Sequence, residues 1–292
     1  MTVSPPLDPG LRIRVVRLAV SDLPRSVDFY TRVVGLRLLT EGDEVAVLGA
    51  EHGVPLLHLT LVHDAVPEPP GSTGLFHVAV LVPARRDLAA VVRRVARAGW
   101  RFTGASDHGV SEALYLRDPD HLGLELYWDR PRELWPYTPD GSRIAMVSDP
   151  LDLDDLLATH PEEEPASHLP EGTVVGHVHL RVSDVDRATS FYRDAAGFDV
   201  VATMPMAAFL SAGGYHHHVG LNAWESRGGA PPPPESPGLR LVEFEVADLE
   251  PVASRLAAHE TPVTRDGDLL TLHDPDRAPL AFVERHRSSP GA

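Results

Sequence analysis

The sequence predicts an α+β protein built from four copies of one βαβββ module. A long repeat is the first observation: RLAVSDLPRSVDFY at 17–30 returns as HLRVSDVDRATSFY at 179–192, and a glycine follows each copy, Gly35 or Gly197. The second is that alternating apolar residues pass into helical periodicity within each copy. The third is an Asp-Pro-Asp turn at 118–120 and again at 274–276, each before an apolar strand. A repeated stretch of this kind indicates a repeated structural unit.

Modules one and three each begin with a strand whose apolar residues alternate, around Leu18 in one copy and Leu180 in the other. The Ser-Asp pair that follows is a helix N-cap signal, and the amphipathic helix after it is expected to end near the glycine. Residues 56–62 are the expected closing strand of module one. The order of elements is therefore strand, helix and further strands.

Modules two and four are weaker copies of the same unit. Their first strands are FHVAVLV at 76–82 and RLVEFEV at 240–246, and their helices are expected at 86–99 and 249–259. The Asp-Pro-Asp turns then lead into the last strands, DPDHLGLELY at 118–127 and DPDRAPLAF at 274–282.

Two connections separate these modules. Residues 130–171 are rich in Pro, Asp and Glu, with a short helical candidate at 151–158, and we expect a linker on the surface. Residues 227–237 contain Pro231 to Pro234 and must be extended. These connections divide the chain into two halves.

Composition narrows the function. The 292 residues are 43% hydrophobic, as in a folded globular protein, and the formal net charge of −16 disfavours nucleic acid as a partner. There is no cysteine, so a metal ion would be held by histidine and carboxylate. The first ten residues carry no secretory signal and no stretch is long enough to cross a membrane, so we expect a cytoplasmic protein without membrane partners.

The strand-Ser-Asp-helix-Phe-Tyr signature and the Asp-Pro-Asp turn followed by Leu-Glu-Leu-Tyr resemble the vicinal oxygen chelate superfamily, which includes glyoxalase I, bleomycin resistance proteins and extradiol dioxygenases. The resemblance covers nearly the whole chain. It implies the glyoxalase/extradiol dioxygenase fold, with four modules forming two incomplete β-barrels. We expect a first domain at 10–136, a linker at 137–171 and a second domain at 172–287, with two modules in each domain.

Three further segments are similar to compact bacterial catechol 2,3-dioxygenases: DHGVSEALY at 107–115, YWDRPRELWP at 127–136 and GYHHHVGLNAW at 214–224. This resemblance implies a non-haem iron extradiol dioxygenase of aromatic catabolism. Its partners would be a small aromatic diol and O2, and the reaction would insert oxygen next to the vicinal hydroxyls.

In that superfamily the metal ligands come from the first strands of the modules and from the last strand. The first-strand position is Val15, His77, His177 and Leu241 in modules one to four, and the last-strand carboxylate position is Glu125 in module two but Ala281 in module four. Two histidines and one glutamate form the facial triad of non-haem Fe(II), and Mn(II) could replace it because such ligands do not select sharply between the two. We expect His77, His177 and Glu125 to bind the metal.

These ligands lie in modules two and three, so a barrel of modules one and two would not hold all three. We therefore expect module two to pair with module three, either within the chain or across a homodimer.

The resemblance also places the residues that act on substrate. Tyr115 and His108 match a tyrosine and a histidine that precede the ligand glutamate, and the base histidine falls in the cluster 216–218. We expect His217 to be this base, with His218 as the rival. We expect His179 to face away from the site as a structural residue, and we consider Trp128, Trp135 and Phe209 as wall residues.

Three other functions fit the same repeat. A glyoxalase-like isomerase, lyase or hydrolase would use the metal without oxygen chemistry, but would want a second carboxylate where this chain has histidines. A metal-free small-molecule binding protein of the antibiotic-resistance type would leave the two histidines and the glutamate without a shared purpose. A purely structural repeat predicts no histidine clustering. Oxygen uptake and bound iron distinguish the dioxygenase from the first two.

Overall fold

The computed structural model describes residues 7–141, 143–160 and 167–285. Module one comprises β1 (Arg12–Val20), α1 (Leu23–Asp28), the π-helical η1 (Phe29–Val34), β2 (Arg37–Glu41), β3 (Val45–Gly49), η2 (Glu51–Gly53) and β4 (Pro55–Leu61). Module two comprises β5 (Gly74–Leu81), α2 (Arg85–Arg97), β6 (Gly104–Asp107), β7 (Ser111–Arg117) and β8 (Gly123–Asp129). A connection follows with η3 (Arg132–Leu134), β9 (Asp149–Pro150) and α3 (Leu153–Ala158). Module three comprises β10 (Val174–Arg181), α4 (Val185–Ser190), the π-helical η4 (Phe191–Ala195), β11 (Asp199–Met204), β12 (Ala207–Ser211) and β13 (Val219–Asn222). Module four comprises β14 (Gly238–Val246), α5 (Glu250–Ala258), β15 (Thr264–Asp266), β16 (Leu269–His273) and β17 (Pro279–Glu284).

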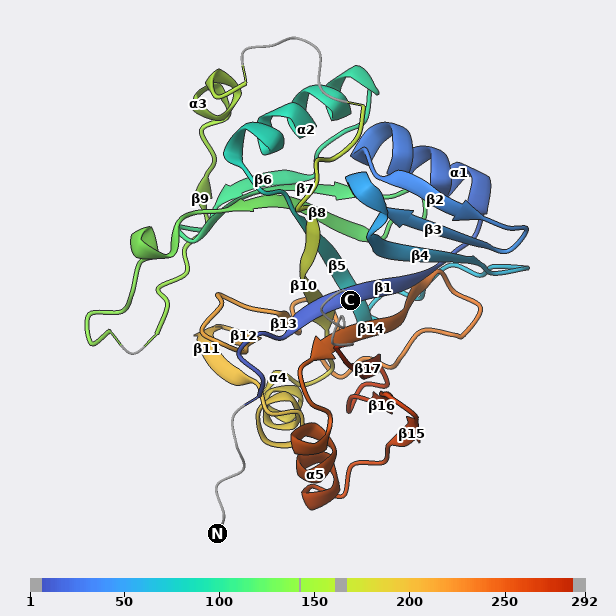
Figure 1. Ribbon diagram of the computed structural model, residues 1–292, viewed down its shortest axis with the longest axis vertical. Coiled ribbons are helices and arrows are strands. Elements are labelled where there is room, and N and C mark those ends of the chain that lie inside the picture. The colour runs from blue at the N-terminus through green and yellow to red at the C-terminus, as the bar shows by residue number, and fades with distance from the viewer. Residues whose placement is uncertain (1–6, 142, 161–166, 286–292) are drawn as a thin grey trace, which may run out of the picture.

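The modules form two curled sheets, which confirms the predicted α+β fold of βαβββ units in incomplete barrels (Figure 1). One sheet joins modules four and one in the strand order β15-β16-β17-β14-β1-β4-β3-β2. The other joins modules three and two in the order β11-β12-β13-β10-β5-β8-β7-β6-β9. We call these the 1–4 sheet and the 2–3 sheet. The expected pairing of modules two and three therefore occurs within one chain.

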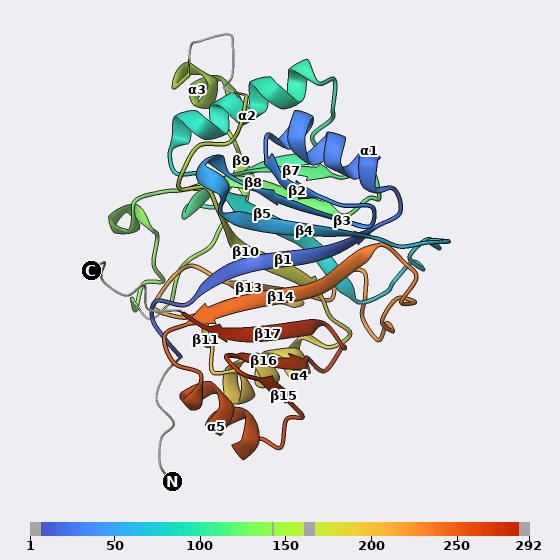
Figure 2. The same cartoon turned by 45° about the vertical axis from the view of Figure 1, so that its right-hand side comes forward.

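Antiparallel first strands join the modules in each sheet: β1 pairs with β14, and β10 pairs with β5. Figure 2 shows β1 and β14 side by side in the middle of the 1–4 sheet. In the 2–3 sheet the register shifts between Val175 and His177 and again beyond His179, which leaves Gly176 and Phe76 as bulged residues. Each bulge immediately precedes a histidine, and bulges commonly redirect a side chain next to a functional site.

The repeated sequence signature contacts the Asp-Pro-Asp turn of the next module. Ser21 donates its backbone N–H and its hydroxyl to Asp120, and Tyr30 donates its hydroxyl to Asp118 at 3.1 Å. The second half repeats the contacts: Ser183 donates to Asp276, and the Tyr192 hydroxyl donates to Asp274 at 3.2 Å. We call these two sets of contacts the signature–turn contacts. They join consecutive modules that belong to different sheets.

The helices begin as the sequence predicts. Asp22 and Asp184 each accept a hydrogen bond from the backbone N–H three residues later, which satisfies a free donor at the helix start. The π-helical turns over the Phe-Tyr pairs were not predicted. Gly35 ends the first of them at φ 95°, a left-handed backbone conformation that favours glycine.

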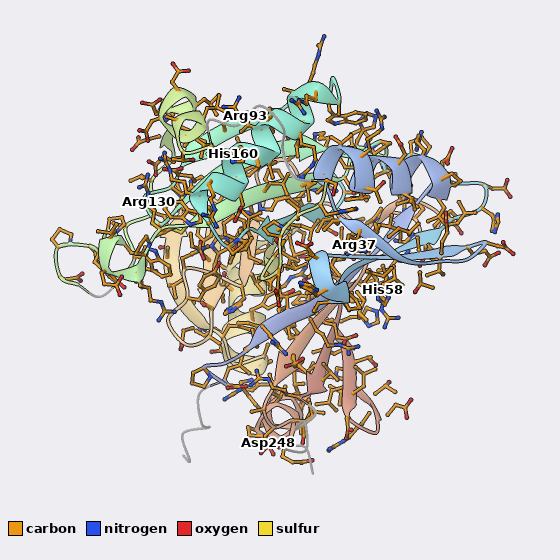
Figure 3. The ribbon with its side chains drawn as sticks, turned by 45° about the horizontal axis from the view of Figure 1, so that its top comes forward. Arg37, His58, Arg93, Arg130, His160 and Asp248 are labelled. Atoms are coloured by element: carbon orange, nitrogen blue, oxygen red, sulfur yellow. The ribbon has the colours of Figure 1, made fainter. Side chains whose placement is uncertain are left out.

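The connection between the halves packs against module two. β9 pairs with β6, and α3 lies along α2, where Arg93 donates to the carbonyl oxygen of His160 (Figure 3). The domain boundaries 10–136, 137–171 and 172–287 stay a prediction, and their positions 142, 161–166 and 286–287 lie outside the described residues. Among the described helices, none is long and apolar enough to cross a membrane.

Candidate metal centre

Three buried side chains from adjacent strands converge in the 2–3 sheet. His177 on β10, His77 on β5 and Glu125 on β8 place one ligand atom each within 4.8 Å of the others. The Nε2 atoms of both histidines approach the same carboxylate oxygen, Oε2 of Glu125, at 2.9 Å for His77 and 3.2 Å for His177. The structure thus brings together the three residues expected as metal ligands.

The protonation of this cluster suits metal binding, which requires neutral imidazole and ionised carboxylate. Burial lowers the pKa of His177 to about 4, which keeps it neutral at physiological pH. Burial opposes ionisation of Glu125, but the two imidazoles together hold the pKa of its carboxyl well below its usual range.

The donor set fits a divalent metal ion. Nε2 of His77 is buried and lies near the Glu125 carboxylate without the alignment of a hydrogen bond. A buried polar nitrogen of this kind needs a partner, and a shared ion would provide one for all three residues. Two nitrogens and one oxygen leave half of an octahedron open, as in non-haem Fe(II) sites.

The 1–4 sheet has no such set at the equivalent described positions, which are Val15, Leu241 and Ala281. The buried Glu243 nearby pairs instead with Arg14 and Arg17. The two sheets therefore share their strand order but differ in chemistry, and the candidate metal centre occurs in the 2–3 sheet.

Tyr115 and His108 meet beside the cluster. The Val147 carbonyl can only accept, so it takes the Nδ1 hydrogen of His108 at 2.8 Å, which leaves Nε2 of His108 to accept from the Tyr115 hydroxyl at 2.7 Å. Burial, together with the nearby Glu125 charge, raises the pKa of Tyr115 well above its usual value. Tyr115 is thus a protonated phenol whose oxygen faces the cluster.

The three consecutive histidines have three different surroundings. His217 packs its ring 4.0 Å from that of His177 and lines the cavity in front of the cluster. His216 contacts His217 and Asp129, whereas Nδ1 of His218 faces the Ser211 hydroxyl at 3.1 Å. Of the two histidines considered as the base, His217 is the one placed in the cavity wall.

The cavity has a volume of about 490 Å³ and a largely apolar lining. Phe209 lines it as expected, together with Phe76 and Trp224, but Trp128 and Trp135 do not. His179 also lines it, with its ring 5.0 Å from that of His77, so the expectation that it faces away is wrong. Residues two apart on a strand share a face, and His177 and His179 are two apart.

Several residues around the site were missed by sequence reasoning. Asp129 shares the alternation of Glu125 and Tyr127 along β8, so strand periodicity could have found it. Met146, Val147 and Ser148 line the cavity from the connection between the halves, which was expected only to cover the surface. The contact of residues 146–148 with the cavity joins segments that are distant in sequence, and no local sequence pattern predicts it.

Comparisons with known proteins agree with this architecture. The chain matches the family described as Glyoxalase/Bleomycin resistance protein/Dioxygenase superfamily over residues 12–126 and 174–274. Catechol-2,3-dioxygenase of Bacillus subtilis (strain 168) is 42% identical to it over 250 residues, which are 84% of this chain and 87% of that protein.

Solved structures show the same fold at low sequence identity. A candidate dioxygenase from Bacillus subtilis subsp. subtilis str. 168 superposes with a TM-score of 0.62 at 17% identity, covering 93% of this chain and 84% of that one. Glyoxalase I from Zea mays superposes with a TM-score of 0.58 at 19% identity, covering 94% and 92%. At such identities the likeness concerns the arrangement of the modules.

Proposed function

The chain belongs to the glyoxalase/bleomycin resistance protein/dioxygenase superfamily, and we propose that it is an extradiol ring-cleaving dioxygenase of the catechol 2,3-dioxygenase type. The observation that carries the proposal is the convergence of two histidines and one glutamate from three adjacent strands. The 42% identical Bacillus subtilis relative supports the same activity. The substrates would be a small aromatic diol and O2.

His77, His177 and Glu125 would hold Fe(II), with Mn(II) as an alternative ion for the same ligands. When bound, the metal supplies Lewis-acid activation of the diol and the one-electron chemistry that O2 requires. The protein keeps these three side chains buried. Phe76, Phe209 and Trp224 would enclose the aromatic ring and exclude water from it.

His217 would accept the proton of a substrate hydroxyl. Burial, followed by the neighbouring His177, lowers the pKa of His217 well below its usual value, so its imidazole is neutral at physiological pH and can accept a proton. Tyr115 and His108 would bind oxygen atoms of the reacting groups from the opposite side. His218 has its Nδ1 turned to Ser211, which favours His217 as the base.

The donor set disfavours a glyoxalase-like reaction. Among the described residues that line the cavity, Glu125 is the one carboxylate, and the position where a second would be wanted holds histidines. A metal-free binding protein would have no use for three converging, buried ligands. The dioxygenase reading accounts for the carboxylate, the histidines and the apolar wall together.

The test is anaerobic purification with metal analysis, followed by addition of catechol and O2. We expect bound iron, oxygen uptake and a yellow ring-cleavage product. Glu125→Gln keeps the size of the side chain but removes the charged ligand, so both iron and product should fall by at least about tenfold.

Glu112→Gln is the matched control, because Glu112 is equally buried on the neighbouring strand β7 but lies outside the cavity. This variant should retain its iron. Bound metal without oxygen uptake would replace the proposal by a metal-dependent isomerase or lyase. Absence of metal from every preparation would favour a ligand-binding protein.

A further inference from the structure

A chain of hydrogen bonds runs behind His217, away from the cavity. Oδ1 of Asp129, the last residue of β8, lies 2.7 Å from Nε2 of His216. Nδ1 of His216 in turn lies 2.8 Å from Nδ1 of His217. The His216 side chain is fully buried, whereas the Asp129 side chain is 20% exposed.

With Asp129 ionised and both imidazoles neutral, the hydrogen bonds of this chain determine which nitrogen of each ring carries the hydrogen. An ionised carboxylate can only accept, so Nε2 of His216 carries the hydrogen that Asp129 receives. A neutral imidazole has one N–H, which leaves Nδ1 of His216 as an acceptor. Nδ1 of His217 must then be the donor, and Nε2 of His217 is left without a hydrogen.

Asp129 is itself held in place. The Tyr215 hydroxyl donates to its second oxygen, Oδ2, at 2.8 Å, and the Tyr127 hydroxyl lies 2.7 Å from that of Tyr215. The ring of Trp135 packs 5.4 Å from that of His216 and limits its rotation. Oδ1 of Asp129 is therefore the oxygen free to meet His216.

We infer that Asp129 and His216 are positioning residues that hold His217 in the Nδ1–H tautomer, with Nε2 presented as an acceptor toward the cavity. This inference rests on the proposed function in one respect, since the proton that Nε2 would receive is that of the diol hydroxyl. Asp129 and His216 would act through His217 and would not contact the substrate. Nε2 of His217 is therefore already oriented to accept a proton before the substrate binds.

The first readout is the tautomer itself. Side-chain ¹H–¹⁵N spectra of the full-length chain, recorded without metal and with diamagnetic Zn(II), should show His217 with its hydrogen on Nδ1, with the signal assigned by its loss in His217→Gln. Asp129→Leu keeps the volume but removes the acceptor, and His216→Phe keeps the ring but removes both nitrogens. In each variant His217 should change to a mixture of tautomers.

The second readout is turnover of catechol by the iron-loaded enzyme. Each variant should lower kcat by at least about tenfold while KM and iron content stay within about twofold, because loss of general-base catalysis affects the chemical step. The double variant Asp129→Leu/His216→Phe should lower kcat no further than the more damaging of the two single variants does. Both changes remove the same constraint on His217, so their effects should not add.

Glu68→Leu is the matched control, because Glu68 is a carboxylate of similar exposure that pairs with Arg181. Its kcat and its His217 tautomer should equal those of the wild type. A wild-type His217 with its hydrogen on Nε2 would overturn the inference even if catechol is cleaved. The Nδ1–H tautomer in a protein that cleaves no diol would uphold the positioning and refute the proposed function.

Discussion

The residue before His177 has to be glycine because of what lies over it. A Cβ added at Gly176 would lie 1.7 Å from the Tyr127 hydroxyl oxygen and 2.8 Å from the ring carbon that carries it. Gly176→Ala should therefore displace Tyr127, lower the free energy of unfolding by about 1–3 kcal/mol and weaken metal binding by about tenfold. Denaturant unfolding and metal titration measure the two effects.

The reason for this loss can be checked with a second change. Tyr127→Phe in the Gly176→Ala background removes the nearer of the two clashing atoms and should recover part of the lost stability. Gly104→Ala is the control, since its added Cβ would meet the Tyr115 ring at an ordinary 3.6 Å. Equal losses in Gly104→Ala and Gly176→Ala would mean that the contact with Tyr127 is not the cause.

At this scale the sequence was informative where a repeat gave equivalent positions. The family resemblance gave the ligand positions, comparison of the four modules at those positions left His77, His177 and Glu125, and the structure brings these three together. His179 was misplaced, although simple strand alternation puts it beside His177. The sequence did not point to a role for His216, because the role we infer for it depends on a contact with Asp129, which lies 87 residues away.

At the scale of the elements, each set of signature–turn contacts includes one buried aspartate, Asp118 in the first half and Asp274 in the second. Burial raises the pKa of Asp118 and of Asp274 to about 6. In the unfolded chain the pKa of each would lie near the ordinary aspartate value of 3.8. Between these values the folded protein holds protons that the unfolded chain has lost, so stability falls as the pH rises from about 4 to about 6.

Asparagine imitates the protonated acid at either position. Its oxygen can keep the backbone N–H bonds now accepted by Asp118, and its amide can donate to the Tyr30 oxygen. Asp118→Asn and Asp274→Asn should each raise the free energy of unfolding at pH 7 by up to about 3 kcal/mol and flatten its pH dependence between pH 4 and 6.

Urea unfolding at several pH values measures this, and Asp22→Asn serves as an exposed control at a helix N-cap, where asparagine also caps well. A loss of stability at pH 7 in the Asp118 and Asp274 variants would show that folding does not raise the pKa values of these two acids. The tyrosine and backbone donors would then be strong enough to outweigh burial.

Most elements could be predicted because their signals are local. The N-caps and the glycines of the two repeated helices, and the Asp-Pro-Asp turns before the last strands of modules two and four, lie within a few residues of the elements they control. The partner of each Phe-Tyr pair could not be predicted, since Tyr30 reaches an aspartate 88 residues away. The π-helical turns begin at the same Phe-Tyr pair in both halves, and sequence reasoning did not anticipate them.

For the whole molecule, the ligand set predicted the pairing of modules better than module order did. Consecutive modules would have formed barrels with an incomplete set of ligands, and the structure pairs modules two and three within the chain. The sequence left open whether this pairing occurs within one chain or between two chains. The path of the connection at 130–171 through space cannot be read from its residues. The 2–3 sheet now places ligands from both halves in one centre.

This arrangement predicts that neither half of the chain folds alone. Separated at the connection, the half ending at His160 would leave the pairing edges of β1 and β5 open, and the half beginning at Ser167 would leave those of β14 and β10 open. One apolar cluster also draws residues from all four modules. Each fragment alone should lack cooperative unfolding, whereas the mixed fragments should form a one-to-one complex.

Metal binding reports this assembly, because His77 and Glu125 lie on the first fragment and His177 on the second. The mixture should bind metal at least about tenfold more tightly than either fragment. A first fragment carrying Glu125→Gln should still assemble, as seen by sedimentation, but should not regain metal affinity, which separates folding from binding. Cooperative unfolding of an isolated half would instead show that two modules suffice for a domain. The shared sheets would then form by association of two halves that had already folded.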